Sequence, residues 1–307
     1  MNQPRSKKID VHGWIVLDKD FDQTSTQAVS QVRRLFNAKK GGHAGTLDPR
    51  ATGILPIALG EATKTVPFVM DGRKTYRFTV AWGAETATDD TEGEVTARSE
   101  IRPARADVEA LLPRYTGEIM QVPPKFSAIK VDGERAYDLA RDGEEVTLEA
   151  RPITVETLSL IAFSETEAEF EAECGKGTYV RAIARDIGRD LKCLGHVTAL
   201  RRTRVGPFGE DDTVTLAELR ELADGKITGQ SLEDALLPVE AALAEVPEVK
   251  VTRDIAARLV RGQSAILRGR DAPIDGPAWA SAGGDPIALC EVERGELVPK
   301  RVFVFAA

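Results

Sequence analysis

The stretch TVETLSLIAFSETEAEFEAECG (residues 154–175) contains two runs in which polar and apolar residues alternate. Such alternation is typical of half-buried β-strands, and the short polar connection between the runs indicates an antiparallel hairpin. Elsewhere strands alternate with helices, but several neighbouring strands are joined by similarly short turns. The chain is therefore predicted to have an α+β fold, with a mostly antiparallel mixed sheet flanked by helices, rather than a doubly wound parallel sheet.

Further segments extend and cover this sheet. The run GTYVRAIARDIGRDL (residues 177–191) is predicted to be a helix, because Tyr179, Ile183 and Ile187 fall on one face. A second helix is expected in TSTQAVSQVRRLF (residues 24–36), with Thr or Ser as its N-cap. Strands are expected in GWIVLDK (13–19), RKTYRFTVAWG (73–83) and VTALRRTRVGPF (197–208), and shorter helices near 61–69, 105–113, 216–222 and 236–243. By domain size, the last stretch from residue 245 to residue 307 is predicted to be a small appended β-rich module.

Composition excludes several classes of protein. The chain has 307 residues, of which 42% are hydrophobic, with no apolar run long enough to cross a bilayer and no secretory signal at its start. Its three cysteines and three histidines are scattered and form neither a disulfide framework nor a metal signature. We therefore expect a cytoplasmic protein, not bound to a membrane and without a metal.

The charge is unevenly distributed along the chain, although the net charge is −8. Residues 1–75 carry a net +5 and residues 174–206 a net +6, whereas residues 84–172 carry a net −12. Two basic stretches could form a local surface for nucleic acid despite the acidic total. Acidic residues that merely solvate one face would give the same counts, so charge alone leaves both interpretations open.

The segment GGHAGTLDPRATGILPIALGEATK (residues 41–64) places one carboxylate, Asp48, among turn-forming residues. Pro49 restricts its own φ and pushes Asp48 towards an extended conformation, so the loop should hold this side chain in one direction. A stiff loop of this kind suits a catalytic group. An Asp-Pro turn in which the carboxylate caps backbone N–H groups is the structural alternative. A phosphate-binding loop is disfavoured, because the Walker spacing is absent.

The segment CGKGTYVRAIARDIG (residues 174–188) brings Tyr179 and Arg181 to the first turn of a predicted helix. Free N–H groups and the helix dipole attract phosphate to such a position. Alternatively, Tyr179 is a core anchor and Arg181 a solvated charge. This segment alone does not choose between a binding role and a structural one.

Together these segments resemble the TruB-type tRNA pseudouridine synthases. The resemblance extends, in the same order, over residues 10–210 and includes KTYRF around Tyr76, TATDDTEG around Asp90, PPKFSAIK (123–130) and ALRRTRVGPF (199–208). One departure is visible, since the family usually has Lys-Pro after the first strand and this chain has Lys19-Asp20. That change bears on the rigidity of the loop rather than on the chemistry.

The resemblance implies the pseudouridine synthase fold and the isomerisation of uridine 55, in the T loop of tRNA, to pseudouridine. The reaction is redox-neutral, so no cofactor is expected. The implied organisation is a catalytic domain at residues 1–244, with an RNA-covering insertion at about 123–151, and a PUA-like RNA-binding module at 245–307. The expected partner is the T arm of tRNA. No protein partner is evident, and we expect a monomer.

The resemblance also assigns roles to individual residues. Asp48 is the implied catalytic carboxylate, which must be ionised, and Arg181 is the cation paired with it. Attack on the ribose, attack on the base and removal of a sugar proton all remain open as its route. Tyr76 is implied to stack on the flipped base and is the third catalytic residue. The remaining implied substrate contacts are His43, which enters the gap left in the T loop, Tyr179 and Leu200 in the pocket, and Lys64 and Lys130 at phosphates.

Two other functions are compatible with parts of this pattern. A tRNA-binding or folding helper without catalysis would keep the basic stretches and could lose Asp48. Because Asp48, Tyr76 and Arg181 are all present, the residues favour an enzyme. A phosphate-loop nucleotide enzyme is disfavoured by the missing Walker pattern.

Overall fold

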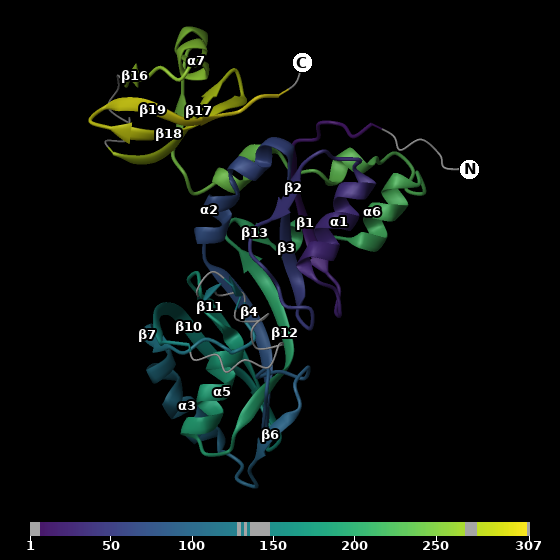
Figure 1. The fold of residues 1–307 in the computed structure, drawn as a ribbon, viewed down its shortest axis with the longest axis vertical. Helices are drawn as coiled ribbons and strands as arrows, with labels where there is room; N and C mark the ends of the chain where they lie inside the picture. Colours follow the sequence, from purple (N-terminus) through teal and green to yellow (C-terminus); the bar gives the residue numbers. More distant parts are fainter. Residues whose placement is uncertain (1–6, 128–129, 132–133, 136–147, 268–274, 306–307) are drawn as a thin grey trace.

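A large mixed sheet forms the centre of the molecule, and a smaller sheet lies at one end (Figure 1). The computed structural model describes residues 7–127, 130–131, 134–135, 148–267 and 275–305. In the large sheet the strands follow the order β14 (Val214–Thr215), β1 (Gly13–Lys19), β3 (Thr52–Leu59), β12 (Gly195–Val205), β4 (Lys74–Trp82), β11 (Glu167–Cys174), β10 (Arg151–Phe163) and β7 (Gly117–Gln121). Two short strands attach to it, β2 (Gly41–His43) on β3 and β13 (Phe208–Gly209) on β12.

The pairing in this sheet is mostly antiparallel. Among the described strands of this large sheet, only β1 with β14 and β3 with β12 run parallel. The predicted hairpin is present as β10 and β11, which pair antiparallel through residues such as Leu158 and Ala172. The predicted α+β class is therefore confirmed, and the hairpin lies in the half of the sheet that ends at β7.

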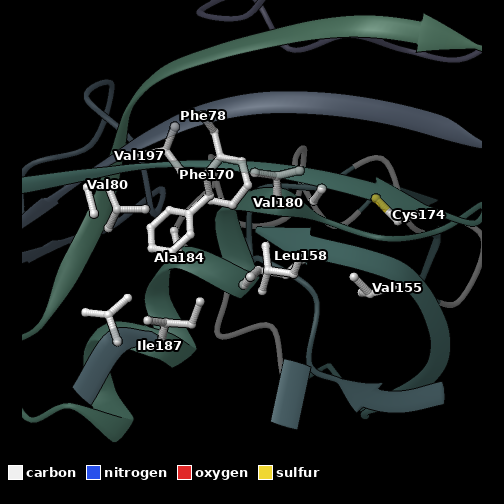
Figure 2. Close-up of a cluster of buried hydrophobic side chains, with 14 of the residues drawn as sticks. Phe78, Val80, Val155, Leu158, Phe170, Cys174, Val180, Ala184, Ile187 and Val197 are labelled. Atoms are coloured by element: carbon white, nitrogen blue, oxygen red, sulfur yellow. The ribbon is translucent and has the colours of Figure 1, made fainter. Parts of the chain in front are cut away.

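Helix α5 (Val180–Asp190) covers that half of the sheet. Its buried residues Ile183, Ala184 and Ile187 belong to the same apolar cluster as Phe78 of β4 and Phe170 of β11 (Figure 2). The rings of Phe78 and Phe170 stack with centroids 5.4 Å apart. Truncating one large aliphatic side chain in such a core costs roughly 2–5 kcal/mol, so this packing holds the start of α5 firmly against β4.

The other half of the sheet is buried on both faces, which explains the continuous apolar run in β1. Ile15 and Leu17 pack in the cluster that contains the buried side of helix α1 (Ser25–Leu35), together with Leu219 of helix α6 (Leu216–Ala223). Trp14 and Val16 point to a second cluster on the opposite side. Successive side chains of a strand alternate between faces, so both sets can be apolar only if both faces are covered.

Helix α1 begins as the sequence predicted. Thr24 is its N-cap, and its hydroxyl accepts from the Gln27 N–H at 3.1 Å while the Gln27 amide accepts from the Thr24 N–H at 2.9 Å. This capping box satisfies N–H groups that have no partner within the helix. The helix ends at Leu35, one residue before the end of the predicted segment.

The shorter helices expected near 61–69 and 236–243 differ in the structure. The first is split into a 3₁₀ turn, η1 (Gly60–Lys64), and a short helix, α2 (Val66–Asp71). Pro67 lies in the first turn of α2, where its missing N–H is tolerated, and a new helix therefore starts there. The second is a 3₁₀ turn, η5 (Val239–Leu243), with Pro238 as its N-cap.

The C-terminal part forms a five-stranded sheet with one helix. Its strands follow the order β15 (Glu248–Lys250), β17 (Gly276–Ala282), β18 (Asp285–Glu293), β19 (Glu296–Val302) and β16 (Ala265–Ile266), and its helix is α7 (Arg253–Val260). Trp279 and Phe303 of this part pack in the same cluster as Trp14 of β1. The β-rich character of the tail is confirmed, whereas the boundary at 244 and 245 and the RNA-binding role of 245–307 stay predictions.

The predicted insertion at about 123–151 is described only in part. Its first residues continue from β7, and the short strands β8 (Lys130–Val131) and β9 (Glu134–Arg135) pair antiparallel. The remaining central residues, 128–129, 132–133 and 136–147, lie outside the described structure. Among the helices that the structure describes, none has the length and apolar character needed to cross a membrane.

Candidate active site

Asp48 lies in the loop that joins β2 to β3. The loop is tied to helix α1 by Ser25, whose hydroxyl donates to the Leu47 carbonyl and accepts from the Leu47 N–H, both at 2.9 Å. The Asp48 carbonyl accepts from the Ala51 N–H at 3.0 Å and so closes the turn around Pro49. The backbone therefore makes the turn, and the carboxylate of Asp48 is directed to another partner.

That partner is Arg181, from the first turn of α5. Its Nε lies 2.9 Å from Oδ2 of Asp48, and its Nη1 lies 3.6 Å from Oδ2 of Asp90. The same guanidinium donates to the carbonyls of Thr88 at 2.9 Å and Phe126 at 3.1 Å. Arg181 is thus buried between two carboxylates, so it is not the solvated charge of the structural alternative.

A pocket opens beside this ion pair. Its lining residues come from the Asp48 loop, the segment around Asp90, α5 and β12, and they are Asp48, Arg50, Ala51, Asp90, Thr91, Arg181, Val197, Thr198 and Leu200. Asp90 is held in place because its Oδ1 accepts from the Thr88 hydroxyl at 2.5 Å and from the Glu92 N–H at 2.9 Å. The pocket lining therefore combines two carboxylates and two arginines with apolar side chains from the Asp48 loop and β12.

Two tyrosines lie within electrostatic reach of Asp48. Burial raises the pKa of Tyr76 and of Tyr179, and the Asp48 charge adds to both increases. Tyr179 is fixed at the start of α5 by Gln121, whose amide accepts from the Tyr179 N–H at 2.9 Å and donates to its carbonyl at 3.1 Å. Both phenols therefore keep their protons at neutral pH, near the carboxylate.

The other predicted site residues are more widely spread. His43 lies on β2 opposite Ile57, and burial, with a smaller contribution from the Arg202 charge, lowers its pKa. Its Nδ1 is buried without a hydrogen-bond partner among the described residues. The backbone of Lys130 lies in β8, and its side chain is outside the described structure.

Lys64 lies at the junction with the C-terminal part. Its Nζ forms an ion pair with Glu61 and donates to the Val302 carbonyl at 2.7 Å. The Glu61 carboxylate also accepts from the Val304 N–H at 2.7 Å. The predicted phosphate contact of Lys64 therefore stays a prediction, for a side chain that already has two partners.

Lys19 supports the loop that carries Asp48, a role that sequence reasoning missed. Its buried Nζ donates to the carbonyls of Asp20 at 2.8 Å, Gln23 at 2.9 Å and Pro49 at 3.2 Å. Burial lowers the Lys19 pKa to about 8, although the Asp48 charge opposes this change. The sequence drew attention to this position only through Asp20, which replaces the family's proline. The contacts of Lys19 now show how the loop is held without that proline.

Arg202 is the second support that sequence reasoning missed. Its side chain is 2% exposed and donates to the carbonyls of Ile54 at 2.8 Å, Thr46 at 3.2 Å and Gly45 at 3.2 Å. It is also the cross-strand neighbour of Tyr76. The sequence contained a signal for this role, since Arg202 is one of three arginines in ALRRTRVGPF, a segment predicted to be a strand.

Three arginines of α5 face an acidic segment at successive turns. After Arg181 along the helix, Arg185 pairs with Asp89 at 3.2 Å and Arg189 pairs with Glu85 at 2.6 Å. Arg185 also donates to the Val122 carbonyl at 2.8 Å, next to the start of the predicted insertion. Burial raises the Asp89 pKa to about 6, in spite of the nearby arginines. This series of pairs positions the segment that carries Asp90.

The arrangement is suited to carboxylate chemistry. Asp48 is accessible from the pocket and is paired with the guanidinium of Arg181, and an accessible carboxylate can act as a nucleophile or a base. Within the described part of the chain, no group of three or more His, Cys, Asp or Glu side chains could hold a metal ion.

The chain is similar to a known protein family and to named relatives. The model described as "TruB family pseudouridylate synthase (N terminal domain)" matches residues 33–180, and "tRNA pseudouridylate synthase B C-terminal domain" matches residues 181–244. Proteins named tRNA pseudouridine synthase B include one from Bradyrhizobium diazoefficiens, which is 62% identical over 98% of this chain and 88% of its own length. Another, from Sinorhizobium medicae, is 56% identical over 99% of both chains.

The fold is shared with solved structures of much lower identity. A chain of a Cbf5-Nop10-Gar1 complex superposes with a TM-score of 0.72 at 24% identity, covering 95% of this chain and 85% of that chain. A chain of an H/ACA RNP bound to a substrate RNA gives a TM-score of 0.74 at 22% identity, with the same coverage. At these identities the likeness concerns the fold alone.

Proposed function

The chain belongs to the TruB family of pseudouridylate synthases, and from this premise we propose that it isomerises uridine 55 in the T loop of tRNA to pseudouridine, with Asp48 as the catalytic carboxylate. The observation that carries the role of Asp48 is its 2.9 Å ion pair with the buried Arg181, at the wall of a pocket. The family models and the relatives confirm the family resemblance that the sequence indicated.

The isomerisation breaks the bond between the ribose C1′ and N1 of the base and forms a bond between C1′ and C5. The C5 proton is lost and N1 gains a proton, so no electrons are supplied from outside. An ionised Asp48 could act on the ribose, on the base ring or on a sugar proton. Each route needs a charged carboxylate open to the substrate, and the pair with Arg181 supports that state.

The target uridine must leave its stacked position to reach Asp48, at a cost of a few kcal/mol. Tyr76 and Tyr179, both close to Asp48, are suited to hold the flipped base by stacking and hydrogen bonding. Leu200 supplies an apolar wall of the pocket. We assign His43 to the space that the uridine leaves, because its lowered pKa keeps the imidazole neutral and able to stack among bases.

The decisive experiment measures tritium release from a T-arm stem-loop RNA that carries uridine labelled at C5. Wild-type protein should release tritium, and an RNA with cytidine in place of uridine 55 should yield no pseudouridine when mapped. The variant Asp48→Asn should lose turnover while retaining most of its RNA affinity in a filter-binding titration. Asn has nearly the same shape, but it is neither an anionic nucleophile nor a base.

A matched control is Asp10→Asn, which removes an exposed carboxylate paired with Lys39 far along the chain from the loop. It should leave turnover unchanged. RNA binding without any tritium release by the wild type would favour the helper without catalysis. Substantial release by the Asp48→Asn variant would instead assign the chemistry to another group.

We extend the proposal to the remaining parts of the chain. Residues 245–307 are assigned as a PUA-like RNA-binding module attached to a catalytic domain at 1–244, and residues 123–151 as an insertion that covers the RNA. The protein is proposed to act as a cytoplasmic monomer without a protein partner. Light scattering of the purified protein, with and without tRNA, tests its oligomeric state. Removal of 245–307 tests whether the module adds affinity.

A further inference from the structure

An exposed aromatic residue lies beside the catalytic loop, in the turn that follows β1. Phe21 is 51% exposed and belongs to no buried cluster of the described chain. The guanidinium carbon of Arg50 lies 5.2 Å from the centroid of its ring. Arg50 is itself a lining residue of the Asp48 pocket. Phe21 therefore stands at the edge of the pocket, backed by a cation.

The turn that carries Phe21 is held rigidly against the catalytic loop. The N–H of Asp22 donates to the Pro49 carbonyl at 2.9 Å, and Asp22 has a φ of +60°, in the left-handed region. The Lys19 ammonium donates to the carbonyls of Asp20 and Gln23, on either side of the turn, and to the Pro49 carbonyl. It therefore connects the turn to the Asp48 loop. An exposed ring on such a support loses little conformational freedom when a ligand binds to it.

The charges around Phe21 indicate which part of an RNA could bind there. Asp20 and Asp22 flank the ring in sequence, and Asp22 lies 4.0 Å from Nε of Arg50. Two carboxylates disfavour a phosphate at this point, and Asp22 already partly neutralises Arg50. A nucleobase is neutral and planar, and RNA-binding proteins stack unpaired bases on aromatic rings and on arginine planes.

We propose that Phe21, supported by Arg50, is a stacking platform for an unpaired nucleobase of the substrate RNA next to the flipped uridine. This inference rests on the proposed function and adds a binding site to it. The platform lies at the position where this chain has Lys19-Asp20 in place of the family's Lys-Pro. It would supply affinity and fix the RNA over the pocket, and it takes no part in bond breaking.

The first test compares four variants by filter binding of the T-arm stem-loop RNA. Phe21→Ala should weaken binding about fivefold to a hundredfold, the range expected when one base loses an aromatic partner. Phe21→Leu should lose nearly as much, because it keeps apolar area without a ring, and Phe21→Tyr should bind like the wild type. Ile161→Ala, which truncates a similarly exposed apolar side chain on β10, should have no effect.

The second test identifies the nucleotide. A series of stem-loop RNAs, each with one abasic nucleotide in the loop, is titrated with wild-type protein and with Phe21→Ala. At the nucleotide that stacks on Phe21, the abasic RNA should bind both proteins equally. Removing the base and removing the ring abolish the same interaction. At every other position the difference between the two proteins should persist.

The platform would be overturned by normal affinity of Phe21→Ala, by wild-type affinity of Phe21→Leu, or by a loss that no abasic position abolishes. An equal loss in Ile161→Ala would also overturn it, because the effect would not belong to this site. Failure of the proposed function is seen separately, as wild-type protein that binds the RNA without forming pseudouridine. Since Phe21 is exposed, its substitution does not threaten the fold, which circular dichroism checks.

Discussion

Asp48 and Arg181 form an ion pair of 2.9 Å in which only the arginine is buried, with side-chain exposures of 35% and 7%. The cation is held by carbonyls of two other segments and by a second carboxylate, Asp90, so its position does not depend on Asp48. The carboxylate, by contrast, stays open to the pocket. A substrate can therefore reach Asp48 without displacing the group that favours its charge.

Replacing Arg181 should lower the rate of turnover, and it should change the stability of the sheet less. Arg181→Lys keeps a charge but cannot serve Asp48, Asp90 and both carbonyls at once, because an ammonium lacks the planar fork of a guanidinium. We expect a loss in kcat on the order of 10²-fold, comparable with removal of one preorganised electrostatic contact. Arg181→Met should lose more, since it also leaves Asp90 and Asp48 without their cation. Single-turnover assays measure the effect, and near-normal rates in both variants would rule out a role for the pair.

Tyr76 offers a test that separates the ring from the hydroxyl. Tyr76→Phe should bind RNA nearly normally, because the ring still stacks. Tyr76→Leu should lose affinity worth roughly 1–3 kcal/mol, the value of one base–aromatic stack. If the hydroxyl takes part in the last proton removal, Tyr76→Phe should stall after the glycosidic bond has broken. Wild-type turnover in both variants would show that Tyr76 lies outside the reaction.

Asp89 should make stability depend on pH in a specific window. Burial disfavours the charge and raises its pKa from the ordinary 3.8 to about 6 in the folded protein. A carboxyl whose pKa is raised binds more protons in the folded state, so the free energy of unfolding falls as pH rises from about 4 to about 6. The full effect is on the order of 3 kcal/mol. The groups that face Asp89 are Arg185, Arg181, Arg189 and Asp186.

The variant Asp89→Asn isolates this contribution. Chemical denaturation at a series of pH values should show that the variant lacks the fall due to Asp89, so the unfolding free energy of the wild type minus that of the variant should decrease between pH 4 and pH 6. The control is Asp211→Asn, at an exposed carboxyl in a 3₁₀ turn, which should follow the wild-type curve. Parallel curves for Asp89→Asn and the wild type would mean that Asp89 titrates normally.

Lys64 should stabilise the attachment of the C-terminal part. Lys64→Met removes the ion pair with Glu61 and the bond to the Val302 carbonyl, so we expect a lower Tm and faster proteolysis near residues 244–248. Lys300→Met, at an exposed ion pair with Glu293, is the matched control and should change little. If Lys64 instead contacts a phosphate, Lys64→Met should reduce the slope of log tRNA affinity against log salt concentration by about one. Unchanged stability together with that reduction would assign Lys64 to the RNA.

The sequence by itself determined the hairpin of β10 and β11, helix α5 and the capped start of α1, because each depends on periodicity or capping within a short segment. The resemblance also assigned roles to Asp48, Arg181 and Tyr76 from local motifs, and these roles stay predictions. It did not assign Lys19 or Arg202 to the support of the catalytic loop, although both were visible as charged residues in predicted strands. Their burial became evident only once the neighbouring chain segments were in place.

Tertiary structure decided the contacts between distant segments. Arg202 reaches carbonyls about 150 residues earlier because β12 inserts between β3 and β4. Arg185 meets Asp89, and Phe21 comes to stand over Arg50, for the same kind of reason. Local patterns specify helices and strands, but strand order determines which side chains share a site. That order follows from the burial of several faces at once, which no single segment encodes.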